Sequence, residues 1–121
     1  EEETMDPIKV AANIVRERKE ALKNLDSTIR AIARKAREIL GGECQVYLFG
    51  SYVKGCFHPF WSDIDMIIVS DRIAGMTLDE RVKVIIKLKE GLKAQYMYEI
   101  HLVTPKEFEW YKFFAKELVR I

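Results

Sequence analysis

The chain has 121 residues, of which 49% are hydrophobic and 32% charged, so residues 1–121 are expected to form one domain with a buried core and a charged surface. A net charge of +1 excludes a protein that binds nucleic acid through a basic surface as a whole. The sequence lacks the ~20-residue apolar run of a membrane span and the pattern of a signal peptide. With Cys44 and Cys56 predicted to be free thiols, we expect a cytoplasmic protein without membrane contact.

Residues 5–40 have the apolar periodicity of a long helix, with Asp6 as the N-cap and Pro7 as the first helical residue. Arg18 interrupts the apolar stripe. An unbroken helix of this length would be about 50 Å long, whereas a compact domain of this size is about 35 Å across. The helix is therefore expected either to break near residues 24–27, giving a helix pair, or to project beyond the domain.

The two halves of this helical region differ in what their apolar side chains can contact. The half from Leu25 to Ile39 is expected to pack on the core. For the half from Ile8 to Leu22, core packing and self-association both remain open, because one small domain cannot cover so long a stripe. We expect a homodimer or a complex with another protein through this N-terminal helix, together with aromatic surface such as Trp110.

Two short apolar runs follow, and each predicts a buried strand. The first run is Val46–Phe49. The second is the β-branched run Ile64–Val69, which is too short for a helix. Between them lie a Gly-Ser pair, a short helical turn over residues 51–55 and an aromatic-rich loop over residues 56–61. The loop aromatics could stack on a nucleobase, although local packing is the commoner role of such side chains.

Asp63 and Asp65 stand at the start of the second strand. Because side chains alternate along a strand, both carboxylates are expected on one face, where repulsion and burial favour a bound divalent metal. Gly50 lets a ligand approach the backbone, and Ser51 offers a hydroxyl and an N–H at a helix start, which favours phosphate. Lys54 could meet a triphosphate or be a solvated lysine. Together these residues predict a metal–nucleotide site.

The rest of the chain supplies two helices and a third strand. Thr77–Glu80 and Thr104–Glu107 are capping boxes, which open helices to about Glu90 and about Val119, and Tyr96–Val103 is the strand between them. The lysines of the first of these helices are read as its solvated face: Lys83, Lys87 and Lys89. The side chains predicted to be buried on the two helices are Val82, Ile85, Ile86, Leu88, Phe108, Tyr111, Phe114 and Leu118.

This element order predicts an α/β (α+β) fold, a small mixed sheet of three or more strands with helices packed on one face. Gly50-Ser51 followed by Ser62-Asp63-Ile64-Asp65, with a strand on each side, resembles the motif of the DNA polymerase beta-type nucleotidyltransferase superfamily. The short chain is similar to the minimal members of that superfamily, and the resemblance covers residues 46–103. It implies one nucleotidyltransferase domain whose open sheet face holds the active site.

Nucleotidyl transfer uses two metal ions, and two ions need more than two carboxylates. Glu99, set between apolar residues of the third strand, resembles by position the third carboxylate of the superfamily, which is often Asp. His101 shares its face and could bind metal, orient Glu99, contact substrate or play a structural part. The predicted catalytic and metal-binding residues are Asp63, Asp65 and Glu99 with Mg²⁺, and the predicted nucleotide-binding residues are Gly50, Ser51, Lys54 and Ser62.

The resemblance implies a Mg²⁺-dependent enzyme that moves a nucleoside monophosphate, AMP from ATP, onto a hydroxyl of a protein, an RNA or a small molecule. Minimal members often pair with a helical HEPN-domain protein, sometimes as antitoxin and toxin, which implies such a partner here. The alternative is a catalytically inactive nucleotide-binding or partner-neutralising module, which is favoured if Glu99 points away from the aspartates. A phosphohydrolase-like metal site is a third reading, but it leaves the Gly-Ser step unexplained.

Overall fold

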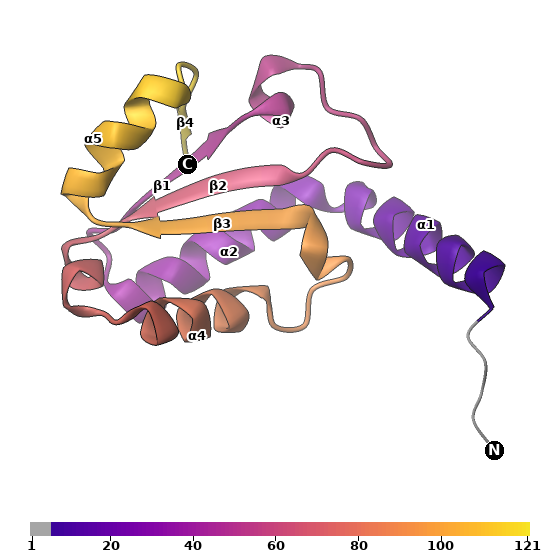
Figure 1. The fold of residues 1–121 in the computed structure, drawn as a ribbon, viewed down its shortest axis with the longest axis horizontal. Coiled ribbons are helices and arrows are strands. Elements are labelled where there is room, and N and C mark those ends of the chain that lie inside the picture. The colour runs from indigo at the N-terminus through magenta and orange to yellow at the C-terminus, as the bar shows by residue number, and fades with distance from the viewer. Residues whose placement is uncertain (1–5) are drawn as a thin grey trace.

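The chain begins with two consecutive helices. The computed structural model describes residues 6–121 (Figure 1), so the predicted start of the helical region at residue 5 lies outside it. α1 spans Pro7–Lys23 and α2 spans Leu25–Leu40, which confirms the predicted break. The Asp6 carboxylate accepts a hydrogen bond from a backbone N–H of the first turn at 3.0 Å, as predicted for an N-cap. Within the described residues, no helix is both long enough and apolar enough to cross a membrane.

Four strands form one mixed sheet in the order β3-β2-β1-β4. β1 (Gln45–Phe49) pairs antiparallel with β2 (Ile64–Val69), and β2 pairs parallel with β3 (Tyr98–Val103), so the predicted mixed sheet is confirmed. β4 (Val119–Arg120) pairs antiparallel with the other edge of β1. The sequence does not predict β4, because a two-residue strand has no periodicity to recognise.

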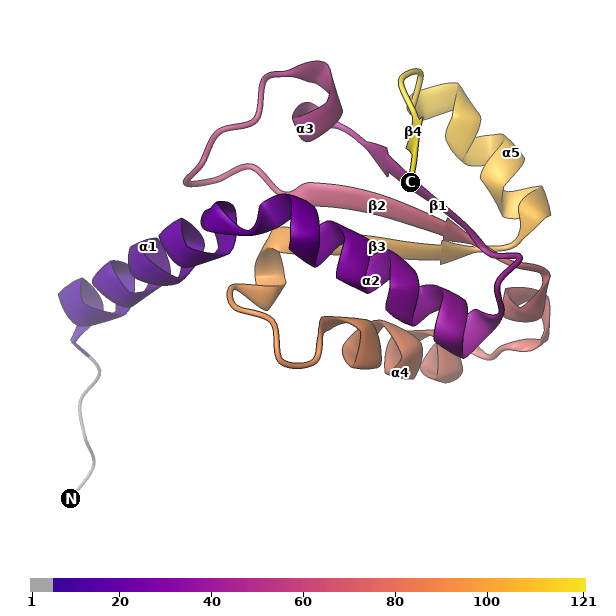
Figure 2. The same cartoon turned by 180° about the vertical axis from the view of Figure 1, so that it is seen from behind.

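α2 and α4 (Leu78–Lys89) cover one face of this sheet, as Figure 2 shows from the helix side. Their apolar side chains meet those of the alternate strand residues that point toward them. Burial of each such aliphatic side chain stabilises the fold by about 1.5–3 kcal/mol. Fully buried members of this core include Ile29, Ile32, Ala36, Val46, Ile64, Met66, Ile68, Leu88 and Tyr98.

The opposite face is covered only in part. α5 (Pro105–Phe114) places Phe108 against Ile67 and Val69, near the end of β2. The start of β2 lies outside this second cluster of buried residues, and Asp65 there is only half-buried. The sheet therefore leaves one end of this face accessible, and that end carries the acidic residues.

Short elements join these layers. α3 (Ser51–Lys54) follows β1, the 3-10 helix η1 (Asp71–Gly75) follows β2, and the 3-10 helix η2 (Gln95–Met97) leads into β3. α3 confirms the helical turn predicted directly after the Gly-Ser step. Both predicted capping boxes are present, at Thr77 with Glu80 and at Thr104 with Glu107.

The structure corrects the buried faces predicted for the last two helices. Val82 and Ile86 are 48% and 62% exposed, whereas Leu88 is buried as predicted and Val84, one helical turn before it, is buried in their place. The apolar run of α4 offers two possible stripes, and packing against α2 selects the other one. α5 ends at Phe114, which is exposed, rather than at Val119, because the chain turns back there to form β4.

Candidate active site

Asp65 and Glu99 lie side by side on neighbouring strands. The parallel register of β2 and β3 pairs Asp65 directly with Glu99, so both side chains stand on the same face of the sheet. Asp63 precedes β2 by one residue and is half-buried. Burial, together with the charges of Glu99 and Asp63, raises the pKa of Asp65 from 3.8 to about 6. The predicted third carboxylate is thus next to the aspartate pair.

The three carboxylates do not form a compact cluster. Within residues 6–121, no three Asp, Glu, His or Cys side chains lie close enough together to hold a metal ion as they stand. Metal binding by Asp63, Asp65 and Glu99 therefore stays a prediction. The donor set suits Mg²⁺, which prefers carboxylate oxygens, and burial together with the neighbouring carboxylates raises the pKa of Asp65, which makes its negative charge unfavourable there.

Gly50 brings the backbone against the Asp65 carboxylate. β1 ends at Phe49, which pairs with Asp65 across β1 and β2, and the chain then turns at Gly50 with φ 81° and ψ −155°. A β-carbon at this position would overlap the Asp65 Oδ2 atom. The conformation belongs almost entirely to glycine. The Gly-Ser step and the Asp-x-Asp motif, separate in the sequence, are therefore one site, with Ser51 beginning α3 beside the carboxylates.

The other two predicted nucleotide-binding residues have different surroundings. Lys54 ends α3 with an exposed side chain. The Ser62 hydroxyl accepts a hydrogen bond from the His58 amide at 2.7 Å, and the Ser62 amide donates to the His58 carbonyl at 3.0 Å. Ser62 thus closes the loop that leads into Asp63. Contact of either side chain with phosphate stays a prediction.

The aromatic side chains of this loop divide into two groups. Phe57 packs on the main core, edge-on to Tyr52 at a centroid distance of 5.6 Å. Trp61 is 72% exposed, and its ring lies parallel to that of His58. Local packing therefore accounts for Phe57, whereas Trp61, close in sequence to Asp63, is stacked on His58 and otherwise largely exposed.

His101 connects Glu99 to α5. Its Nε2 atom lies 3.5 Å from Glu99 Oε1, and its Nδ1 atom lies 3.3 Å from the Tyr111 hydroxyl. The Phe49 ring packs beside it at a centroid distance of 5.8 Å. His101 thus lies between Glu99 and Tyr111, which the sequence offered only as a core residue. Its role in orienting Glu99 stays a prediction.

Lys89 departs from the solvated face predicted for the lysines of α4, because its side chain is half-buried. Burial lowers its pKa, while the negative charges of Glu99 and Asp63 raise it, which places the ammonium group within electrostatic range of the site. Lys83 and Lys87 are exposed, as predicted for the solvated face. Lys89 differs from them because it ends α4 where the chain turns toward β3. Only its place at the end of α4 distinguishes Lys89 from the exposed lysines, and the helical pattern of the sequence does not show that difference.

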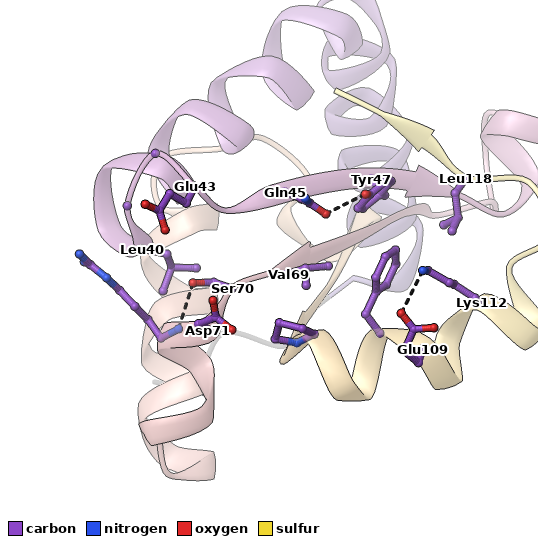
Figure 3. A pocket seen from close by; sticks show the side chains of 15 residues that line it. Leu40, Glu43, Gln45, Tyr47, Val69, Ser70, Asp71, Glu109, Lys112 and Leu118 are labelled. Carbon is purple, nitrogen blue, oxygen red and sulfur yellow. Dashed lines mark hydrogen bonds and ion pairs between the residues drawn. The ribbon is translucent and has the colours of Figure 1, made fainter.

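A pocket of about 510 Å³ lies elsewhere, between the end of β2 and α5 (Figure 3). Tyr47, Val69 and Phe108 form part of its wall, and the ion pair between Lys112 and Glu109, 3.1 Å apart, lies along one side. None of the predicted catalytic or nucleotide-binding residues lines it. The pocket is therefore separate from the carboxylate site.

Comparison with known proteins identifies the family of the chain. The chain matches the family described as the nucleotidyltransferase domain over residues 29–120. A crystal structure of a candidate nucleotidyltransferase has 26% sequence identity and a TM-score of 0.58, covering 76% of this chain and 95% of that one. A second, from Sulfolobus solfataricus, has 19% identity and a TM-score of 0.56, covers 89% of this chain and 85% of that one, and shares the fold. Curated proteins give no match. Since the family match extends over well more than half of its length, the chain belongs to the nucleotidyltransferase domain family.

Proposed function

We propose that the protein is a Mg²⁺-dependent nucleotidyltransferase that transfers AMP from ATP to a hydroxyl group of an acceptor. The observation that carries the proposal is the pairing of Asp65 with Glu99 beside the Gly50 backbone. In the transfer, the acceptor hydroxyl oxygen bonds to the α-phosphorus and its proton passes to solvent, while the bond from the α-phosphorus to pyrophosphate breaks and pyrophosphate leaves with the bonding electrons. Three carboxylates near the open end of the sheet suit that reaction, because the triphosphate of ATP binds together with Mg²⁺, and carboxylates can hold that ion.

Each residue has a distinct part in this proposal. Asp63, Asp65 and Glu99 would hold Mg²⁺, in a two-metal site when both ions are present, and the chemistry bound Mg²⁺ supplies is neutralisation of phosphate charge and activation of the hydroxyl. Gly50 and Ser51 would receive the terminal phosphates, with Lys54 and Ser62 as further contacts. The charges of Glu99 and Asp63 raise the pKa of Lys89, so this lysine adds positive charge to the electrostatic surroundings of the carboxylates from the α4 side.

The inactive alternative, a nucleotide-binding or partner-neutralising module, is favoured if Glu99 points away from the aspartates. Its position beside Asp65 supports the enzyme instead. The acceptor is a hydroxyl of a protein, an RNA or a small molecule, and a HEPN-domain protein is the proposed partner, in a toxin-antitoxin pair. Cys44 and Cys56 are both unpaired, which supports a cytoplasmic location.

ATP with Mg²⁺ is expected to raise the melting temperature, because a ligand that binds only the folded state stabilises it by about 2.7 kcal/mol at a hundredfold excess over Kd. Ser51→Ala should reduce this shift, and Asp63→Asn should remove most of its Mg²⁺ dependence. Scanning fluorimetry with ATP, with and without Mg²⁺, measures both effects. Ser27→Ala, at an exposed serine of α2, should behave as wild type. Equal shifts in all the variants would contradict the assigned site.

Association through α1 is the second part of the proposal. Ile8, Ile14 and Val15 are 79%, 44% and 38% exposed, and α1 projects beyond the sheet (Figure 1). Trp110 and Phe113 of α5 are exposed as well. These side chains support a homodimer or a complex with a helical partner.

The double variant Ile14→Glu, Val15→Glu is expected to dissociate such an assembly while the helical content stays unchanged, since both side chains face solvent in the single chain. Leu22 is unsuitable for this purpose because it packs against the core. Light scattering and circular dichroism measure the two properties, with Lys19→Glu as a control for added negative charge. A wild-type protein that stays monomeric at high concentration would exclude the homodimer.

A further inference from the structure

Arg18 is a charged residue in the interior of the protein. Its relative exposure is 3%, and it is one of two residues that α1 buries, the other being Ala21. A guanidinium group always carries its charge, so burying it is unfavourable unless its N–H groups are satisfied. The hydrogen bonds of Arg18 are therefore needed to offset the cost of burying its charge.

Both hydrogen bonds of Arg18 end on one loop. Nε donates to the Pro59 carbonyl at 2.8 Å, and Nη2 donates to the Ser62 carbonyl at 2.7 Å. The guanidinium group thus joins two carbonyls of the loop through two of its nitrogen atoms. The single ammonium group of lysine cannot reproduce this geometry. The acceptors lie more than forty positions away in the sequence, so α1 and this loop are joined in space through one side chain.

The second of these carbonyls belongs to the peptide unit that joins Ser62 to Asp63. Because a peptide unit is planar, fixing its oxygen also fixes the backbone nitrogen of Asp63. The bonds between Ser62 and His58 close the same loop from within. Arg18 therefore bears directly on the backbone position of Asp63.

Arg18 also contacts the segment that leads into β3. Its Cζ atom lies 5.7 Å from the centre of the Tyr96 ring, in a cation–π arrangement. Tyr96 lies in η2, directly before the strand that carries Glu99. Arg18 thus contacts both the segment that precedes Asp63 and the segment that precedes Glu99.

We infer that Arg18 is a positioning residue, which holds loop 58–62 so that Asp63 stands in place relative to Asp65 and Glu99. The inference rests on the proposed function for the role of Asp63. It assigns α1 a part in the active site as well as in association. The carboxylates themselves do not contact Arg18 through these bonds, so its effect on the reaction passes through the loop.

The test compares Arg18→Met, which keeps the length of the stem and removes both donors, with Arg18→Lys, which keeps the charge. Arg16→Met, at an exposed arginine of the same helix, is the matched control. Hydrogen exchange by mass spectrometry follows the segment 57–63, and steady-state kinetics follow transfer from ATP. In Arg18→Met we expect exchange in this segment to rise selectively, and kcat to fall by about a hundredfold with KM for ATP changed far less. Arg18→Lys should show a smaller rise in exchange and a smaller fall in kcat than Arg18→Met.

The outcomes separate this inference from the proposed function. For Arg18→Met, unchanged exchange at 57–63 or a uniform rise across the whole chain would overturn the inference. A normal kcat in a variant whose exchange at 57–63 has risen would overturn it as well. If the wild-type protein transfers no nucleotide, the proposed function fails, and the selective exchange result alone decides whether Arg18 holds the loop. Should Arg18→Met not fold, the comparison between Arg18→Lys and Arg16→Met decides it.

Discussion

Replacing Asp65 by Asn is expected to stabilise the metal-free protein at neutral pH and to reduce nucleotidyl transfer by roughly a thousandfold, the equivalent of about 4 kcal/mol. The two effects have one cause. Asp65 is held beside Glu99 and Asp63 in a half-buried position, where a negative charge is unfavourable in the absence of a cation. An amide removes that charge, and with it a ligand that the reaction needs.

The pH dependence of stability gives the sign of this effect. The pKa of Asp65 is about 6 in the folded protein, above the ordinary value of 3.8, so the folded state binds the proton more tightly than the unfolded state. The stabilising contribution of the protonated carboxyl is complete below pH 3.8, declines as the pH rises, and is lost above about 6. Solvent screens a half-exposed side chain, so the gain in the Asn variant at pH 7 should be about 1 kcal/mol.

Chemical denaturation in EDTA between pH 4 and pH 7.5 measures the difference between wild type and Asp65→Asn. We expect the two proteins to agree at the acid end and the variant to be more stable at the neutral end. Asp71→Asn, at an exposed aspartate of η1, controls for the loss of a carboxylate in general. A variant that is less stable than wild type at pH 7 without metal would show that Asp65 is stabilising rather than electrostatically unfavourable.

Replacing Gly50 by Ala is expected to lower the free energy of unfolding by about 3 kcal/mol or more and to abolish activity. The backbone at Gly50 has φ 81° and ψ −155°, which costs a residue with a side chain about 1–3 kcal/mol. The new methyl group would in addition overlap the Asp65 carboxylate. Relief of that overlap would displace the carboxylate from its place beside Glu99.

Gly55 provides the matched control. It also has a positive φ, 77°, but apart from its own chain neighbours no atom lies within 4 Å of the place where its β-carbon would be. Gly55→Ala should therefore cost about 1 kcal/mol from the backbone alone and leave activity intact. Urea denaturation of both variants, and of Gly50→Ala combined with Asp65→Ala, separates the backbone cost from the overlap. Equal losses for Gly50→Ala and Gly55→Ala would contradict a close contact with Asp65.

Local patterns in the sequence were enough to predict most of the fold. The three longer strands follow from short apolar or alternating runs, and both capping boxes from residues three positions apart, because these signals depend on neighbours within one turn or one strand. The adjacency of Glu99 and Asp65 follows from the same alternation, once the two strands are assumed to pair. Confirmation came from their parallel register.

What could not be predicted depends on contacts between distant segments. Arg18 looks like an interruption of an apolar stripe, and only the position of the loop 41–44 residues further along makes it a buried donor. Lys89 resembles its exposed neighbours until the end of α4 is placed near β3. Val82 and Ile86 fit a buried face as well as Val84 does, and the choice between them is made by α2.

The parallel register of β2 and β3 has a consequence for insertions and deletions. Sliding β3 by one residue would turn Glu99 toward the helices and expose Ile100 and Leu102, because the side-chain period of a strand is two. Each lost aliphatic contact would cost about 1.5–3 kcal/mol, and the buried carboxylate would add to that loss. The connection before β3 can therefore change in length without moving Glu99, since the strand re-seats on its apolar residues. The position of the carboxylate is fixed by the core behind the sheet, not by the loop that leads to it.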